Sequence, residues 1–97
     1  MALYVDDPRH PLGRMKMCHM TADSLEELHA AADRLGLKRA WFQGPPASRF
    51  NHYDISLSRR RRAVDELDAQ EVSTREIVTV ARRMTLQEAL KTPRGRY

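Results

Sequence analysis

The residues of this 97-residue chain whose types could do chemistry lie in a few short stretches. The densest stretch is His52-Tyr53-Asp54, and two further groups, His19 and Asp6, lie far upstream. Imidazole and carboxylate groups together suit zinc, manganese or iron, and both also serve as general acids and bases. We therefore predict that His52, Asp54 and His19 are catalytic, acting as acid or base or as ligands of a divalent metal, with Asp54 alternatively orienting a histidine. No two histidines stand four residues apart, as they do in helical metal motifs, so the metal is one interpretation among others.

Arg60 is the residue that we predict to bind an anion. Residues 59–62 are four consecutive arginines, and on a helix they cover about 300° of rotation, so they cannot share one solvated face. Arg60 stands three, four and seven residues before the apolar positions 63, 64 and 67, which places it on the inward face of that helix. There it would clamp a phosphate or carboxylate, or form an ion pair with Asp54 or Asp23.

Four more residues complete the predicted ligand-binding group: Asp6, Asp23, His29 and Tyr53. For two of them the pattern favours a structural interpretation. Asp23 fits a helix cap, because its carboxylate can accept from backbone N–H groups at a helix start. His29 lies beside the apolar stripe of the predicted first helix, where a partly buried structural histidine is common.

The net charge of +4 is concentrated at the C-terminal end. The last 23 residues hold six basic and two acidic side chains, which accounts for the whole excess. Such a segment favours contact with phosphate, so we predict Arg82 and Arg83 as nucleic-acid-binding residues. A solvated helix followed by a basic tail is the alternative interpretation.

Several classes of protein are excluded by composition. No apolar run approaches the roughly 18 residues that a membrane span needs, and the N-terminus carries acids where a signal peptide carries bases. The single cysteine, Cys18, excludes an intrachain disulfide and a Cys-rich zinc module, and it reads as a small core residue. We therefore predict a cytoplasmic protein without a membrane partner.

The hydrophobic pattern predicts one α/β domain over residues 1–90 and a flexible basic tail over 91–97. Short apolar runs predict strands over residues 3–5, 15–20, 37–43 and 71–72. Apolar spacing predicts helices over about 23–35, from Ser56 or Ser58 to about Asp68, and from Ser73 onward. Capping-box spacing marks two helix starts, Asp23 with Glu26 and Ser73 with Glu76. Proline and glycine predict loops over 8–13 and 44–48.

The alternation of strands and helices predicts a small three- to four-stranded, mostly parallel sheet with βαβ crossovers and two to three helices. The first strand could instead pair antiparallel with the second, and Asp6 would then lie at the edge away from the site. In open parallel sheets, ligands bind at the carboxyl ends of the strands. That edge would hold His19, Asp23, Gln43, residues 52–54 and residues 73–75, beside the N-terminus of the second helix, which favours an anion.

Several ordered motifs resemble a family of small bacterial and phage proteins, the domain of unknown function DUF4031. They are Tyr4-Val5-Asp6-Asp7, Gly13-Arg14-Met15, Met17-Cys18-His19-Met20, Ala22-Asp23, Glu26-Glu27-Leu28-His29-Ala30, His52-Tyr53-Asp54-Ile55 and Ser58-Arg59-Arg60. The resemblance covers about residues 2–73 and brings no established activity, substrate or catalytic residue. It implies that eight polar positions match a recurrent pattern: Asp6, His19, Asp23, Glu27, His29, His52, Asp54 and Arg60.

Three functions fit these observations. In the first, a His/Asp/Arg pocket at the carboxyl edge of the sheet binds or hydrolyses a phosphorylated ligand, a nucleotide or a nucleic-acid end. In the second, the protein is a non-catalytic accessory factor that binds nucleic acid or protein through its basic third helix and tail. In the third, the polar residues form a buried hydrogen-bond network that fixes the fold. The residues leave open whether the protein is an enzyme and how many copies assemble.

Overall fold

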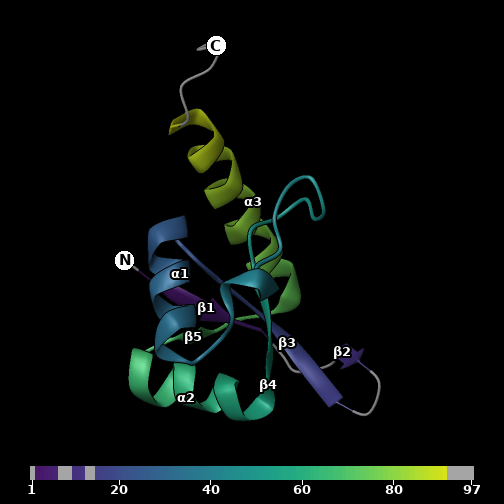
Figure 1. Ribbon diagram of the computed structural model, residues 1–97, viewed down its shortest axis with the longest axis vertical. Coiled ribbons are helices and arrows are strands. Elements are labelled where there is room, and N and C mark those ends of the chain that lie inside the picture. The colour runs from purple at the N-terminus through teal and green to yellow at the C-terminus, as the bar shows by residue number, and fades with distance from the viewer. Residues whose placement is uncertain (1, 7–9, 13–14, 92–97) are drawn as a thin grey trace.

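A central sheet with helices on both faces organises the chain (Figure 1). The computed structural model describes residues 2–6, 10–12 and 15–91. In chain order the elements are β1 (Leu3–Val5), β2 (His10–Leu12), β3 (Met15–Ala22), α1 (Leu25–Arg34), the 3₁₀ helix η1 (Arg39–Trp41), β4 (Tyr53–Ser56), α2 (Leu57–Leu67), β5 (Gln70–Glu71) and α3 (Thr74–Lys91).

The eight-residue strand β3 is the centre of the sheet. Met20 opposes both Val5 of β1 and Tyr53 of β4, and Met17 opposes both β2 and β4. Strands β1 and β2 therefore lie one after the other along one edge of β3, and β4 lies along the other edge. Strand β5 continues the sheet beyond β1, and within the described residues β1–β5 is the one parallel pair. The five strands thus fill four positions of a mixed, mostly antiparallel sheet.

The expectation of a mostly parallel sheet is therefore wrong. The predicted strand over 37–43 does not form: its middle is the 3₁₀ helix η1, and only Gln43 makes a bridge, with His52. The next strand is β4, which pairs antiparallel with β3. It contains Tyr53 and Asp54 of the polar stretch that follows the proline-rich loop. One of the predicted βαβ crossovers is present. Strands β1, β4 and β5 all run opposite to β3, so β4 and β5 are parallel to each other, and helix α2 connects them.

The sequence left open whether the first strand runs parallel or antiparallel to the next one. Strand β1 pairs antiparallel with β3, from Leu3 opposite Ala22 to Val5 opposite Met20. The predicted loop over 8–13 also contains a strand, β2, which pairs antiparallel with the start of β3. The predicted tail over 91–97 lies outside the described residues apart from Lys91, at which α3 ends.

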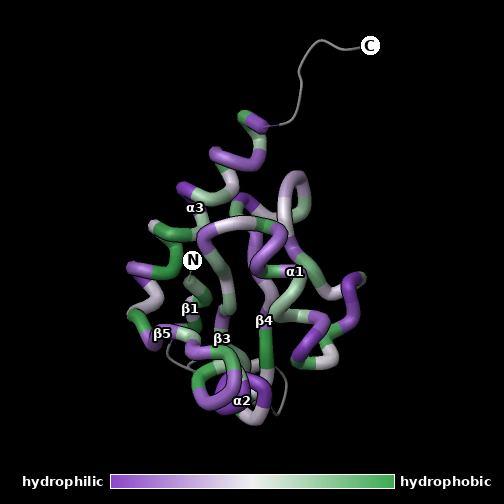
Figure 2. Tube along the Cα trace, turned by 90° about the vertical axis from the view of Figure 1, so that its left-hand side faces the viewer, coloured by the Kyte–Doolittle hydropathy of each residue, from purple (hydrophilic) through white to green (hydrophobic). Residues whose placement is uncertain are grey.

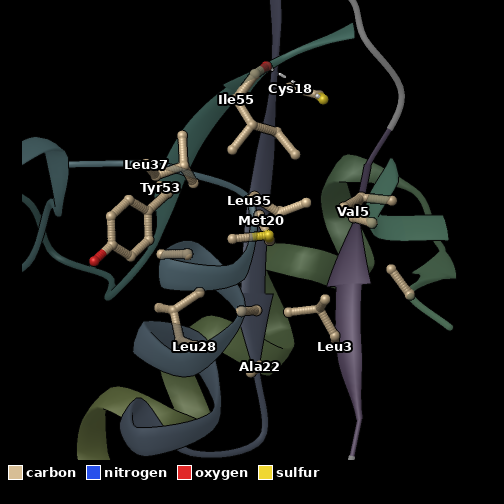
Figure 3. Packing of buried hydrophobic residues seen from close by; sticks show 14 of the residues in the cluster. Leu3, Val5, Cys18, Met20, Ala22, Leu28, Leu35, Leu37, Tyr53 and Ile55 are labelled. Atoms are coloured by element: carbon tan, nitrogen blue, oxygen red, sulfur yellow. Dashed lines mark hydrogen bonds between the residues drawn. The ribbon is translucent and has the colours of Figure 1, made fainter. Parts of the chain in front are cut away.

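The main hydrophobic core fills the face of the sheet that α1 and α2 cover (Figure 3). Side chains alternate between the faces of a strand, so this face receives alternate residues of β1, of β4 and of residues 17–22 of β3. These residues are all buried: Leu3, Val5, Cys18, Met20, Ala22, Tyr53 and Ile55. Cys18 is a fully buried core residue, as predicted, and its thiol lies 3.5 Å from the carbonyl oxygen of Ile55.

Helix α3 covers the opposite face of the sheet. Ile77, Ala81 and Met84 are the buried residues of this 18-residue helix, at the spacing that the sequence predicted, while Val80 is half-buried. The C-terminal turns extend past the sheet, where Leu86 and Leu90 are exposed (Figure 1 and Figure 2). Among the described residues, no helix has the length and hydropathy needed to cross a membrane.

Helix starts and ends follow local sequence signals, with one correction. The cap of α1 is Ser24 rather than Asp23: Ser24 Oγ accepts from the Glu27 N–H at 3.1 Å. The predicted capping box of α3 is confirmed, since Ser73 Oγ accepts from the Glu76 N–H at 3.0 Å and the Ser73 N–H donates to the Glu76 carboxylate at 3.1 Å. Gly36 ends the first helix with a positive φ of 74°, which glycine adopts without steric cost.

Candidate metal-binding site

Strand pairing brings His19, His52 and Asp54 together on the α3 side of the sheet. His19 of β3 stands directly opposite Asp54 of β4, and cross-strand partners have Cβ atoms about 4.5–5.5 Å apart. His52 precedes Asp54 by two residues and so shares its face. Asp54 Oδ1 lies 3.6 Å from His52 Nε2 and 3.9 Å from His19 Nε2. One ligand atom from each residue falls within 4.8 Å of the others, which confirms the predicted convergence.

Each histidine has its Nδ1 atom held by an oxygen acceptor. His52 Nδ1 lies 2.8 Å from the carbonyl oxygen of Phe50, and His19 Nδ1 lies 2.7 Å from Asp6 Oδ2. Because a carbonyl and an ionised carboxylate only accept, both Nδ1 atoms carry the proton. In the neutral rings, the two Nε2 atoms therefore present lone pairs beside Asp54 Oδ1. A proton or a metal cation between these nitrogens and the carboxylate oxygen is therefore favoured.

Asp6 is a fully buried carboxylate that supports His19. Its Oδ1 accepts from the His19 backbone N–H at 2.7 Å, and its Oδ2 accepts from the His19 ring and, at 2.9 Å, from the Thr74 hydroxyl. Burial alone would raise the pKa of Asp6, but these hydrogen bonds outweigh it and hold the pKa below its usual value. The hydrogen bond to Asp6 in turn raises the pKa of His19, which burial opposes and the charges of Asp6 and Asp54 reinforce.

The expectation that an antiparallel first strand would keep Asp6 away from the site is wrong. Asp6 follows the last residue of β1, and its N–H donates to the carbonyl oxygen of His19 at 3.2 Å. Strand β3 extends well beyond β1, so the end of the short strand meets the middle of the long one. A residue at the end of one strand can thus orient a side chain inside its neighbour.

Gln43 fixes the other side of the cluster. Its Nε2 donates to Asp54 Oδ2 at 2.8 Å, which leaves Oδ1 facing the histidines. Its backbone pairs with that of His52, with N···O distances of 2.9 and 3.0 Å in the two directions. Gln43 and Thr74 carry a weak sequence signal, since both were expected at the ligand-binding edge. The Phe50 carbonyl carries none, because every residue has one.

The cluster is accessible from two sides. The exposed fractions of the three side chains are 24% for His19, 13% for His52 and 35% for Asp54. A small apolar recess separates the two histidines from α3, with Thr21, Phe50 and Ile77 among its walls. On the other side, Asp54 lines an open groove of about 410 Å³ that also contains Trp41 and Arg59.

Arg60 lies on the inward face of α2, as predicted, but its ion pair differs from the expected one. Its Nε donates to the backbone carbonyl of Asp6 at 2.7 Å, and its Nη1 lies 3.0 Å from a Glu71 carboxylate oxygen. Neither Asp54 nor Asp23 is the partner. Arg60 thereby joins α2 to Asp6 at the end of β1, and its predicted role in clamping an anion stays a prediction.

Three other predicted ligand-binding residues lie away from the cluster. Tyr53 points to the core face, opposite to His52 and Asp54, and its hydroxyl lies 2.8 Å from His29 Nδ1 (Figure 3). Burial, helped by the charge of Arg39, lowers the pKa of His29. Asp23 accepts from the Tyr4 hydroxyl at 2.9 Å. Their roles in ligand binding remain untested predictions.

Arg82 and Arg83 are both exposed on α3, but they do not form one surface. Consecutive helix residues point about 100° apart. The Arg82 guanidinium lies 5.7 Å from the centre of the Phe50 ring, while Arg83 lies beside Tyr4 and Asp23. Binding of nucleic acid by these arginines stays a prediction.

Comparison with known proteins gives one match. A family model described as "Protein of unknown function (DUF4031)" matches residues 3–84, which is most of the chain. No curated protein and no solved structure matches the chain.

Proposed function

The chain belongs to the DUF4031 family of proteins of unknown function, and from its geometry we propose that it binds one divalent transition-metal ion through His19, His52 and Asp54. The ligand atoms are the two histidine Nε2 atoms and Asp54 Oδ1. We further propose that the bound ion serves to bind and hydrolyse a phosphorylated ligand.

The observation that carries the proposal is the support behind each ligand. Histidines that bind metals almost always donate their second ring N–H to a carboxylate or a backbone carbonyl, which fixes the tautomer and the ring orientation. Here His19 donates to a buried carboxylate and His52 to a carbonyl, and Gln43 donates to the outer oxygen of Asp54. These contacts turn both histidine Nε2 atoms toward Asp54 Oδ1, which is the arrangement that a shared metal ion requires.

The distances also suit a metal ion. With Zn–N bonds of about 2.0–2.1 Å, tetrahedral ligand atoms lie roughly 3.3 Å apart. The distances from Asp54 Oδ1 to the histidine nitrogens, 3.6 and 3.9 Å, exceed this by only a few tenths of an ångström. Two imidazoles and one carboxylate are the ligands of catalytic zinc sites and of non-haem iron sites, both of which keep open coordination positions.

The charge balance favours an anionic ligand. The three direct ligands, one carboxylate and two neutral imidazoles, would leave a divalent ion with a charge of about +1, and the Asp6 anion lies behind His19 rather than on the ion. A metal ion with an open position supplies a site for water or for a phosphoryl oxygen, which is the chemistry of metal-assisted hydrolysis. Asp54 also lines an open groove, and we propose that the ligand approaches the ion from there.

Zinc titration by calorimetry, together with thermal denaturation, tests metal binding. We expect one Zn²⁺ per chain and a higher Tm with zinc, and we expect His52→Ala and Asp54→Asn to weaken zinc binding by at least about tenfold. The matched control is Asp65→Asn, the same chemical change at an exposed aspartate of α2, which should bind zinc as the wild type does. Absence of zinc binding in the wild type, or equal binding in Asp54→Asn, would contradict the proposal.

Hydrolysis is tested separately on the zinc-loaded protein with a chromogenic phosphate ester. The wild type and Asp65→Asn should release the chromophore at equal rates, and Asp54→Asn should not exceed the rate of zinc alone. Zinc binding without any hydrolysis of phosphate esters would support the proposed metal site and contradict the proposed hydrolytic reaction.

A further inference from the structure

The groove beside Asp54 contains a large exposed aromatic ring. Trp41 is the single tryptophan of the chain, and 44% of it is exposed although most large apolar residues are buried. It lies at the end of η1, whose last turn is closed by a hydrogen bond from the Trp41 N–H to the Lys38 carbonyl at 2.9 Å. The apolar side chains of Met17 and Leu37 line the same groove. Trp41 is therefore positioned at the groove with nearly half of its surface exposed to solvent.

Two cations flank this ring. Lys38 Nζ lies 5.6 Å from the centre of the Trp41 ring, and Arg59 Cζ lies 5.7 Å from it. The Arg59 Nε donates to the Leu35 carbonyl at 3.0 Å, which fixes the guanidinium at the groove. Within the described part of the chain, neither cation has a carboxylate within 4.0 Å. Their positive charge is thus available to an anion.

We propose that this groove binds a nucleotide, with the base stacked on Trp41 and the phosphate between Arg59 and the ion held by Asp54. The inference rests on the proposed metal site and names the substrate class of that site. Aromatic side chains stack on every base because each base has a π-face, and an arginine fork suits phosphate. A volume of about 410 Å³ is within the range of sites for small molecules. The aromatic ring, the Arg59 guanidinium and the ligand carboxylate line one groove, and Lys38 lies beside the ring, which matches the parts of a nucleotide.

The fluorescence of Trp41 reports directly on stacking because the chain has no other tryptophan. With zinc present, we expect AMP to quench this fluorescence to saturation. Ribose 5-phosphate, which lacks the base, should bind more weakly and leave the fluorescence unchanged. Absence of quenching by AMP, or equal binding of AMP and ribose 5-phosphate, would overturn the proposal.

Variants of the platform are measured by calorimetry with AMP. Trp41→Ala should lower the affinity at least about fivefold, and Trp41→Phe, which keeps a ring, should retain most of it. Leu86→Ala, at an exposed apolar residue on the far part of α3, is the matched control and should bind AMP as the wild type does. Equal affinity for AMP in Trp41→Ala and the wild type would also overturn the proposal.

Two further measurements distinguish a free nucleotide from a nucleic-acid end and separate this inference from the proposed metal site. A 5′-phosphorylated trinucleotide that binds more tightly than AMP supports a nucleic-acid end as the ligand, and one that binds no more tightly supports a free nucleotide. Trp41→Ala should still bind zinc. Zinc binding without binding of AMP therefore overturns this inference alone, whereas absence of zinc binding overturns the proposed function.

Discussion

Asp6 is the residue that connects the fold to the proposed site. It is fully buried, and among the described residues its carboxylate accepts from the backbone and the ring of His19 and from the Thr74 hydroxyl. A buried carboxylate with all its donors in place is stable as an anion, and it keeps the His19 proton on Nδ1. The ring nitrogen on which His19 carries its proton thus depends on a residue 13 positions away in the sequence.

Asp6→Asn tests this dependence. The amide has nearly the same shape but no charge, so it holds the His19 ring less firmly and makes Nε2 less basic. We expect zinc affinity to fall by about 10- to 100-fold, the usual effect of removing a partner behind a metal ligand. Calorimetry at a temperature where the variant is folded measures it. Unchanged affinity would show that Asp6 has only a structural role.

The raised pKa of His19 predicts how zinc binding depends on pH. Zinc and a proton compete for Nε2, so the affinity should decline as the pH falls through the raised pKa, and this decline should begin above the usual histidine value of about 6.5. In Asp6→Asn the hydrogen bond that raises the pKa is weakened, so the decline should move to lower pH. Zinc titrations between about pH 5.5 and pH 8.5 measure both curves. A shift to higher pH in the variant would contradict the assignment.

At the scale of the elements, the first turn of α3 has two separate tasks. Ser73 caps the helix through its hydroxyl, while the neighbouring Thr74 hydroxyl donates to Asp6. The N-terminal end of the helix also carries a partial positive charge, which favours a nearby carboxylate. Helix α3 therefore both covers the sheet and supports the Asp6–His19 pair.

A matched pair of substitutions separates these tasks. Thr74→Val removes a donor to a buried carboxylate, so we expect it to lower the free energy of unfolding by about 1–3 kcal/mol and also to weaken zinc binding. Ser73→Ala removes only the cap, so it should cost about 0.5–2 kcal/mol and leave zinc affinity unchanged. Urea denaturation and zinc titration of both variants give the comparison. Equal zinc affinity in the two variants would refute a role for Thr74 in the site.

At the scale of the whole molecule, the two faces of the sheet hold histidines with opposite electrostatic settings. On the core face, burial first and then Arg39 lower the pKa of His29. On the α3 face, the hydrogen bond to Asp6 raises the pKa of His19. The first histidine favours folding when it is neutral, and the second favours folding when it is protonated. Their contributions to the pH dependence of stability therefore have opposite signs.

His29→Gln isolates one of these contributions. The unfolded chain takes up a proton on His29 at about pH 6.5, but the folded chain does so only at lower pH, so His29 destabilises the fold as the pH falls below about 6.5. His19 acts oppositely, since its contribution is present below about pH 6.5 and is lost as the pH rises through its raised pKa. We expect the stability of His29→Gln, measured by urea denaturation of the zinc-free protein, to decline less on acidification than that of the wild type. An equal or steeper decline would contradict the lowered pKa.

The sequence by itself determined the features that depend on near neighbours. The Ser73–Glu76 box, the glycine after the first helix and the apolar spacing of 77, 81 and 84 are all contacts or conformations within one turn of helix. The strand over the start of β3 and the burial of Cys18 follow from the two-residue alternation of a strand. The sequence also indicated His19, His52 and Asp54 as candidate site residues, because imidazole and carboxylate side chains are the usual metal ligands and general acids or bases.

Only the tertiary structure decided strand direction, and with it the partners of each site residue. An alternation of strands and helices is compatible with either direction, because a connection of some 30 residues between β3 and β4 is long enough to return the chain in parallel or antiparallel orientation. The pairing of His19 with Asp54 and the contact of Asp6 with His19 join segments that are far apart in the chain. Which histidine nitrogen carries the proton depends on a backbone carbonyl and a buried carboxylate, whose positions are set by packing rather than by any local pattern.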